Sequence, residues 1–228
     1  MGEDKFIVLS ALICEPARAK MLWNLLDGRA YTAGELAIAA DISPTSASNH
    51  LVKLLEADLL KVESQGRHRY FSFSRPEVAY VVESLANLAN QQADKIRSRE
   101  GAVKTGVKYC RSCYDHLAGQ VGVQITDAFE YKNWIIKDGS FYLVNEAGWK
   151  HLKDLNISEN DLTGKRRPVA RQCLDWSERR PHLAGQLGAL VLNRMLEKQW
   201  FRKVQFSREL ILTDKGRLGL YDLLDIRI

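Results

Sequence analysis

The sequence predicts a mainly α-helical protein with small β hairpins, an α+β fold in two domains over residues 1–100 and 107–228. Two observations support this. Between residues 31 and 73, two short helical patterns precede two β-like stretches around a basic turn. After residue 107, one motif occurs twice, and its length makes a chance repeat improbable. We therefore expect a helical N-terminal domain with one hairpin, followed by a duplicated C-terminal domain.

The first helices are predicted from apolar spacing and from their start signals. Apolar residues recur at helical spacing over 6–13 and 19–26, and Pro16 between them suits a first helical turn. Thr32 stands three residues before Glu35, the signature of a capping box, which predicts a short helix over Ala33 to Ala40. These segments form the core of the predicted N-terminal domain.

Ser43-Pro44 opens the next predicted helix, which runs to about Ala57 and exposes small polar groups in its first turns. Such groups can hydrogen-bond base edges and phosphates in a major groove. Two β-like stretches, 59–64 and 69–73, then flank a basic tip and predict a hairpin. Helix, turn, helix and basic hairpin make a winged helix-turn-helix, so we predict contacts to DNA from Ser43, Pro44, Thr45, Ser46, Ser48, Asn49, His50, Lys53, Arg67, His68 and Arg69.

The runs GELAIAADI and ISPTSASNHLVKLLEADLLKVESQGRHRYFSF resemble the arsenic-repressor (ArsR/SmtB) family of bacterial transcriptional regulators, over roughly residues 6–100. The resemblance implies a homodimer that binds a double-stranded DNA operator, represses, and leaves the operator when an inducer binds. It makes Ser43 to Lys53 the recognition helix and Arg67 to Arg69 the wing tip. It also implies that the last helix, predicted over Glu77 to Arg99, pairs with the first helix across the dimer.

The usual metal sensor of that family is missing. Alanines occupy the segment Glu35 to Asp41, where an arsenic-type site requires thiols, and residues 77–99 contain no histidine for the alternative site. We therefore expect the effector, a small molecule, a thiol-reactive compound or a metal, to be sensed within residues 107–228.

The repeat consists of Cys113-Tyr-Asp-His-Leu-Ala-Gly-Gln-Val-Gly and of Cys173-Leu-Asp followed later by His182-Leu-Ala-Gly-Gln-Leu-Gly. It predicts copies over about 110–160 and 170–228, each a winged-helix-like αββα unit. Two helices are expected to start at His116 and His182, with Asp115 and Asp175 capping them. The closing helices are expected over Gly148 to Leu155 and Gly216 to Leu224.

The cysteines are too few for a disulfide scaffold. Cys110 and Cys113 are two residues apart, and Cys173 is the counterpart of Cys113. With His116 or His182 they can hold zinc or another thiophilic metal, sense oxidants or soft metals, or simply pack in the core. No cofactor is required by the sequence.

The second copy carries an insertion over 176–181. Trp176, Arg179 and Arg180 there can frame a pocket for an aromatic or anionic effector, or form a solvated turn with one packed tryptophan.

Bulk properties exclude several classes. The net charge of +5 is compatible with a polyanion partner, although residues 1–100 are nearly balanced in charge. No apolar run is long enough for a membrane span, and the MGEDKF start lacks a secretion pattern, so we expect a cytoplasmic protein with no membrane partner. No catalytic motif is complete. We predict a DNA-binding transcriptional regulator, a repressor rather than an enzyme. The alternatives are an enzyme or carrier domain over 107–228 targeted by a winged helix, and an adaptor without an effector.

Overall fold

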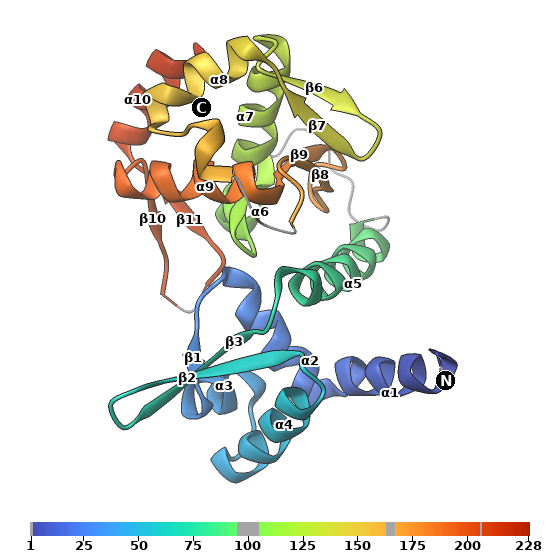
Figure 1. The fold of residues 1–228 in the computed structure, drawn as a ribbon. Coiled ribbons are helices and arrows are strands. Elements are labelled where there is room, and N and C mark those ends of the chain that lie inside the picture. Colours follow the sequence, from blue (N-terminus) through green and yellow to red (C-terminus); the bar gives the residue numbers. More distant parts are fainter. Residues whose placement is uncertain (1, 95–104, 163–166, 206) are drawn as a thin grey trace. The chain divides into compact units, whose positions relative to one another are not determined.

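The computed structural model describes residues 2–94, 105–162, 167–205 and 207–228 (Figure 1). The chain divides into two compact units, Met1–Ala86 and Asn87–Ile228. No helix in the described ranges is long and apolar enough to cross a membrane.

The first unit begins with α1 (Gly2–Cys14) and α2 (Pro16–Asn24), which continues as the 3-10 turn η1 (Leu25–Asp27). Pro16 occupies the first turn of α2, as predicted. The carboxylate of Glu15 accepts a hydrogen bond from the backbone N–H of Arg18 at 2.9 Å, which satisfies one of the donors left open at the start of α2.

The next two helices, α3 (Ala33–Ala40) and α4 (Pro44–Glu56), start at the predicted signals. Thr32 and Glu35 form the capping box: the Thr32 hydroxyl accepts from the Glu35 N–H, and the Glu35 carboxylate accepts from the Thr32 N–H. Asp41 ends α3 in the left-handed region with φ 58°. Ser43 caps α4 by accepting from the N–H of Ser46 at 3.2 Å. The helix-turn-helix is thus set by local side-chain to backbone bonds.

The wing is a three-stranded sheet in the order β1-β3-β2. Strands β2 (Leu60–Gln65) and β3 (His68–Phe73) form the predicted hairpin, and Gly66 at its tip has φ +60°. The two-residue strand β1 (Tyr31–Thr32) pairs with β3 and was not expected from the sequence. Helix α5 is described as Pro76–Asp94, and the rest of the helix predicted to Arg99 lies outside the described residues.

The second unit contains the same order of elements twice after α6 (Gly106–Tyr109). The first series comprises β4 (Arg111–Cys113), β5 (His116–Ala118), α7 (Gly119–Tyr131), β6 (Ile135–Asp138), β7 (Phe141–Val144) and α8 (Glu146–Leu152). The short 3-10 turns η2 (Lys153–Leu155) and η3 (Glu159–Leu162) follow. The second series comprises β8 (Arg171–Leu174), β9 (Pro181–Ala184), α9 (Gly185–Glu197), β10 (Phe201–Lys203), β11 (Leu210–Leu212) and α10 (Asp214–Leu224).

Two predictions for this unit were wrong. Each series is ββαββα rather than αββα, and its first helix starts at Gly119 or Gly185 rather than at the histidine three residues earlier. The His-Leu-Ala segments are strands because they pair in register with the strands before them. Gly119 and Gly185 then turn strand into helix with φ +79° and +86°, a conformation that favours glycine.

The sheets of the second unit connect the two series. Strands β4 and β5 form a two-stranded sheet, as do β10 and β11, whereas β6, β7, β8 and β9 form one four-stranded sheet in that order. A large hydrophobic core includes residues of both series, among them Val121, Phe129, Trp134, Leu187, Met195 and Phe201. The histidine-bearing strands β5 and β9 therefore belong to different sheets of one packed unit.

Candidate nucleic-acid interface and metal centre

Helix α4 presents its first turns to solvent. The predicted contact residues exposed there are Ser43, Pro44, Thr45, Ser48, Asn49 and Lys53, while Ser46 is half-buried. The opposite face carries Ala47, Leu51 and Leu54, which are buried in the core of the first unit. The helix is thus held by its apolar face and leaves hydroxyl, amide and ammonium groups available.

The hairpin tip is equally accessible. Arg67, His68 and Arg69 are all exposed, and Gly66 supplies the left-handed turn between the strands. The guanidinium of Arg69 lies over the ring of Phe71 at 5.7 Å. Exposed guanidinium groups on a two-stranded ribbon are suited to phosphate contacts.

His50 is placed differently from the other predicted contact residues. It is half-buried, and its Nδ1 lies 3.5 Å from the Glu15 carboxylate and 3.3 Å from the Arg18 guanidinium. Arg18 is buried and donates to the carbonyls of Leu12 and Ala11 at the end of α1. The backbone N–H of Arg18 lowers the pKa of Glu15, which keeps this carboxylate charged beside His50. His50 therefore ties α4 to the junction of α1 and α2 instead of pointing outward.

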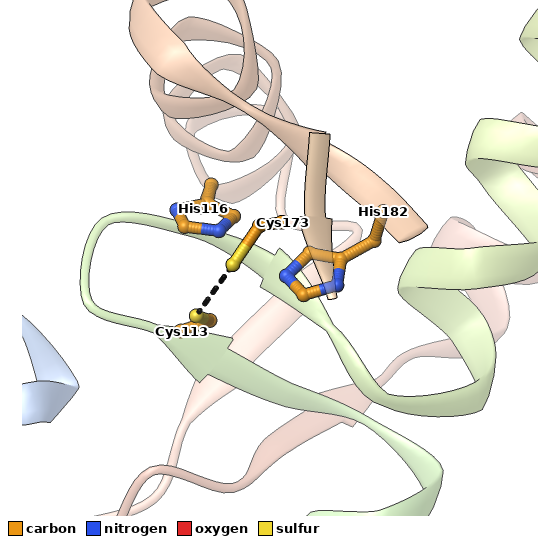
Figure 2. A group of neighbouring side chains, drawn as sticks. All are labelled: Cys113, His116, Cys173 and His182. Carbon is orange, nitrogen blue, oxygen red and sulfur yellow. Dashed lines mark hydrogen bonds between the residues drawn. The ribbon is translucent and has the colours of Figure 1, made fainter. Parts of the chain in front are cut away.

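Four side chains of the second unit converge in its interior: Cys113, His116, Cys173 and His182 (Figure 2). One Cys–His pair comes from each hairpin, at directly opposed positions of β4–β5 and of β8–β9. One ligand atom from each of the four lies within 4.8 Å of the others. The two sulfurs are 3.8 Å apart, and the two imidazole rings stack with centroids 5.0 Å apart. Two thiols and two imidazoles are a donor set that zinc prefers.

Each histidine of this cluster has a carboxylate beside its Nδ1. Asp115 Oδ1 lies 3.3 Å from Nδ1 of His116, and Asp175 Oδ2 lies 3.6 Å from Nδ1 of His182. The carboxylates are held in turn by arginines: Arg167 donates to Asp115 at 2.9 Å, and Arg111 donates to Asp175 at 2.8 Å. Sequence reasoning missed both arginines, because the residues of each pair are more than 50 positions apart.

The expected capping role of the two aspartates needs correction. Asp175 does accept from a helix start, but from the N–H of Gly119 in the other series, at 2.7 Å. Asp115 instead pairs with Arg167 and His116. The cause lies in the hairpins: a strand intervenes between each aspartate and the helix that follows it.

The ring nitrogens of the cluster lack ordinary partners. Nε2 of His116 and both ring nitrogens of His182 are buried without a hydrogen bond. Burial lowers the pKa of His116, but the Cys113 sulfur and the Asp115 carboxylate outweigh burial and raise it to about 9. The surroundings of His116 therefore favour positive charge, which a protonated ring or a cation can supply.

Cys110 lies apart from the cluster. It belongs to the large hydrophobic core, while Cys113 and Cys173 pack with Ala118 and Ala184 in a small cluster of their own. Burial raises the pKa of the Cys110 thiol. The third cysteine predicted as a metal ligand is thus replaced by a second histidine, because Cys110 stands at the end of α6, before β4, and packs in the large core.

The predicted effector residues of the insertion differ in their surroundings. Trp176 is buried beneath the guanidinium of Arg111, which lies 4.6 Å from its ring centroid. Arg180 is exposed and donates to Asp127 at 2.6 Å, and Arg179 is exposed in a turn with φ 55°. A surface hollow of about 390 Å³ is lined by residues of α7 and by the C-terminal residues 224–227.

Comparisons with known proteins decide the family. A helix-turn-helix domain model matches residues 14–63. The HTH-type transcriptional regulator YdfF of Bacillus subtilis (strain 168) is 40% identical over 221 residues, which cover 96% of this chain and 97% of that protein. The chain belongs to the ArsR family. It is therefore an HTH-type DNA-binding transcriptional regulator with an additional C-terminal region, and the relative spans both parts.

Solved structures that resemble this chain match a smaller part of it. HlyU from Vibrio cholerae N16961 is 26% identical, covers 38% of this chain and 94% of its own, and gives a TM-score of 0.36. The homodimeric winged helix-turn-helix domain Mb0332 from Mycobacterium bovis is 18% identical, with coverages of 42% and 89% and a TM-score of 0.38.

Proposed function

We propose that this ArsR-family regulator is a repressor that binds a double-stranded operator as a homodimer and is released by a signal received in its C-terminal region. The observation that carries the DNA-binding part is the joint exposure, on one unit, of the polar start of α4 and the basic tip of the β2–β3 hairpin. A helix of this kind reads base edges in a major groove, while basic hairpin groups contact phosphates.

Exposed apolar surface on α1 supports the dimer. No residue of this helix is buried, and the side chains of Phe6, Ile7 and Val8 are 70%, 58% and 58% exposed. Val81 and Leu85 on α5 are also exposed. A soluble protein rarely leaves such surface open, so we assign it to a second copy of the chain. This arrangement matches the pairing of first and last helices expected from the family.

We also propose that the C-terminal domain, 107–228, consists of two copies of one unit, over about 110–160 and 170–228. The recurring order of hairpin, helix, hairpin and helix supports this. So do Gly148 and Gly216 at corresponding positions: a Cβ on either would lie 2.2 Å from the carbonyl oxygen of Trp134 or Trp200, respectively. With thiols absent from α3, this domain is where we place the effector site.

A salt series of gel shifts tests the proposal. The full-length protein is titrated onto the promoter DNA upstream of its own gene at several salt concentrations. Each phosphate contact contributes about 0.9 to the slope of log affinity against log salt, so losing Arg67 from both protomers in Arg67→Ala should reduce the slope by about 2. Lys150→Ala removes an equal charge from the exposed face of α8 and is the matched control.

Three results would contradict the proposal. If binding does not depend on salt, the protein does not contact the phosphates of the operator. If Lys150→Ala reduces the slope as much as Arg67→Ala does, the wing has no special role in binding. If light scattering of the complex shows one protein chain per operator, the protein does not bind as a homodimer.

A further inference from the structure

We infer that Cys113, His116, Cys173 and His182 bind one resident zinc ion, which fastens the β4–β5 hairpin to the β8–β9 hairpin. The inference does not depend on the proposed repression, because metal content and domain stability are measured without DNA. The ion has a structural role and is not the effector.

The spacing of the sulfurs fits a single four-coordinate ion. With Zn–S bonds of about 2.3 Å at tetrahedral angles, two thiolates lie about 3.8 Å apart. The Cys113 and Cys173 sulfurs are 3.8 Å apart, although no ion is present to set this distance. The remaining ligand atoms, within 4.8 Å of one another, need to close by at most about 1.5 Å to reach zinc-site spacings.

The orphaned imidazole nitrogens point to a missing partner. Buried polar atoms without a hydrogen bond destabilise a fold, and here Nε2 of His116 and both ring nitrogens of His182 lack one. Since Asp115 and Asp175 face the Nδ1 atoms, the Nε2 atoms remain as ligands. A carboxylate that accepts from the far N–H of a ligating histidine is the usual outer partner of a zinc site. The His116 half has this hydrogen bond to Asp115, whereas in the other half Asp175 Oδ2 lies 3.6 Å from Nδ1 of His182, just beyond hydrogen-bond distance.

The donor set and its compactness exclude other occupants. An iron–sulfur cluster with two cysteines and two histidines places the sulfurs on one iron and the nitrogens on the other, which separates the two ligand types by the width of the cluster. Here sulfur and nitrogen ligands lie within 4.8 Å of one another. Hard cations such as Mg²⁺ prefer oxygen ligands. One borderline-soft ion therefore fits best.

Burial makes the site closed. Three of the four side chains are no more than 1% exposed and Cys173 is 6% exposed, so no position remains for water or substrate. Closed four-coordinate sites are structural, whereas catalytic sites keep an open position. The two hairpins belong to separate sheets, so the ion would join segments that share no backbone pairing in the described residues.

Metal analysis of the full-length protein, purified in reducing buffer without chelator, tests the inference. We expect one zinc per chain in the wild type and in Cys110→Ala, a matched control that removes a buried thiol outside the cluster. We expect less than a tenth of that in Cys173→Ser. Less than half a zinc per wild-type chain, zinc lost equally in Cys110→Ala, or a Cys113–Cys173 disulfide in place of metal would overturn the inference.

Cobalt exchange keeps the test decisive if Cys173→Ser does not fold. Wild-type protein exchanged with Co²⁺ should show the intense visible bands of a tetrahedral ion and a thiolate charge-transfer band in the near ultraviolet. The weak bands of a six-coordinate ion would overturn the assignment. Wild-type protein stripped by a chelator should unfold at lower temperature and recover on adding zinc, and an unchanged melting temperature would overturn the structural task.

The outer carboxylates have a separate readout. Asp115→Asn should weaken zinc affinity 10- to 100-fold, the usual effect of losing such a partner, measured by competition with a chromophoric chelator. Asp127→Asn, which alters a carboxylate on the surface of α7, should leave the affinity unchanged. Equal affinities in the two variants would overturn the role of Asp115 in orienting His116.

Discussion

One substitution, glycine to alanine, should have opposite effects at two helical positions of this protein. Gly216 is the third residue of α10, and its N–H is capped by the Thr213 hydroxyl at 3.0 Å. A Cβ there would lie 2.2 Å from the carbonyl oxygen of Trp200, whereas real Cβ atoms essentially never come within 3.0 Å of such an atom. In α3, a Cβ on Gly34 would meet nothing within 4 Å.

The magnitude follows from what must move. The Trp200 carbonyl accepts from the Thr213 N–H at 3.0 Å, and the Trp200 N–H donates to Met195 at 2.8 Å, so the backbone is held on both sides of the contact. Separating α10 from it by about 1 Å is overpacking, which costs about 1–3 kcal/mol. Alanine's helix propensity returns at most about 1 kcal/mol. Because the clash is with a backbone atom held on both sides, its cost lies in the upper half of that range, so Gly216→Ala should lose about 1–2 kcal/mol net. Gly34→Ala should gain about 0.4–1 kcal/mol.

Urea unfolding of the full-length variants measures both effects. Circular dichroism follows the helices of both units, and tryptophan fluorescence reports mainly on the second, which holds four of the five tryptophans. The midpoint of the second unit should fall in Gly216→Ala with an unchanged slope, and that of the first should rise in Gly34→Ala. A Gly216→Ala protein within 0.5 kcal/mol of wild type would refute the packing argument.

Three further predictions concern charge, capping and thiol chemistry. Asp175→Asn leaves a buried guanidinium without its partner and should cost about 3–5 kcal/mol in urea unfolding, while Asp127→Asn, in an exposed pair, should cost less than about 1 kcal/mol; similar losses would contradict the dependence on burial. Thr32→Ala removes the capping box of α3 and should cost about 1 kcal/mol by the same assay, so an unchanged midpoint would count against the cap. Because burial raises the pKa of Cys110, its thiol should stay protonated and resist iodoacetamide at pH 7–8 in the native protein, whereas the exposed Cys14 reacts; mass spectrometry showing equal alkylation would contradict this.

The first unit was predicted well because its signals act over short stretches of chain. The Thr32–Glu35 capping box, the Ser43 cap and the Gly66 turn each lie within a few residues of the bonds that they make. The pairing of β1 with β3 was missed because two residues carry too little pattern to predict a strand. His50 was predicted to face DNA, yet its ring packs toward Glu15, a contact that helical periodicity does not reveal.

The second unit was predicted less well because its decisive contacts join distant segments. Its repeated motif placed equivalent residues in two copies, but apolar His-Leu-Ala segments suit a strand or a helix, and only pairing with the preceding strands settled the choice. Equivalent aspartates likewise turned out to have different partners, since Asp175 caps a helix of the other series.

The sequence by itself determined the winged helix-turn-helix and the missing thiols of α3. It also made Cys113, Cys173, His116 and His182 candidate ligands. The tertiary structure decided which side chains meet. It placed both histidines, rather than one of them, in the ligand set, left Cys110 outside it, and put an aspartate and an arginine beside each histidine. The physical reason is the separation along the chain of the residues that make each contact. Caps and turns are fixed within one helical turn, whereas a ligand set drawn from residues 60 positions apart exists only after two hairpins have packed into one core.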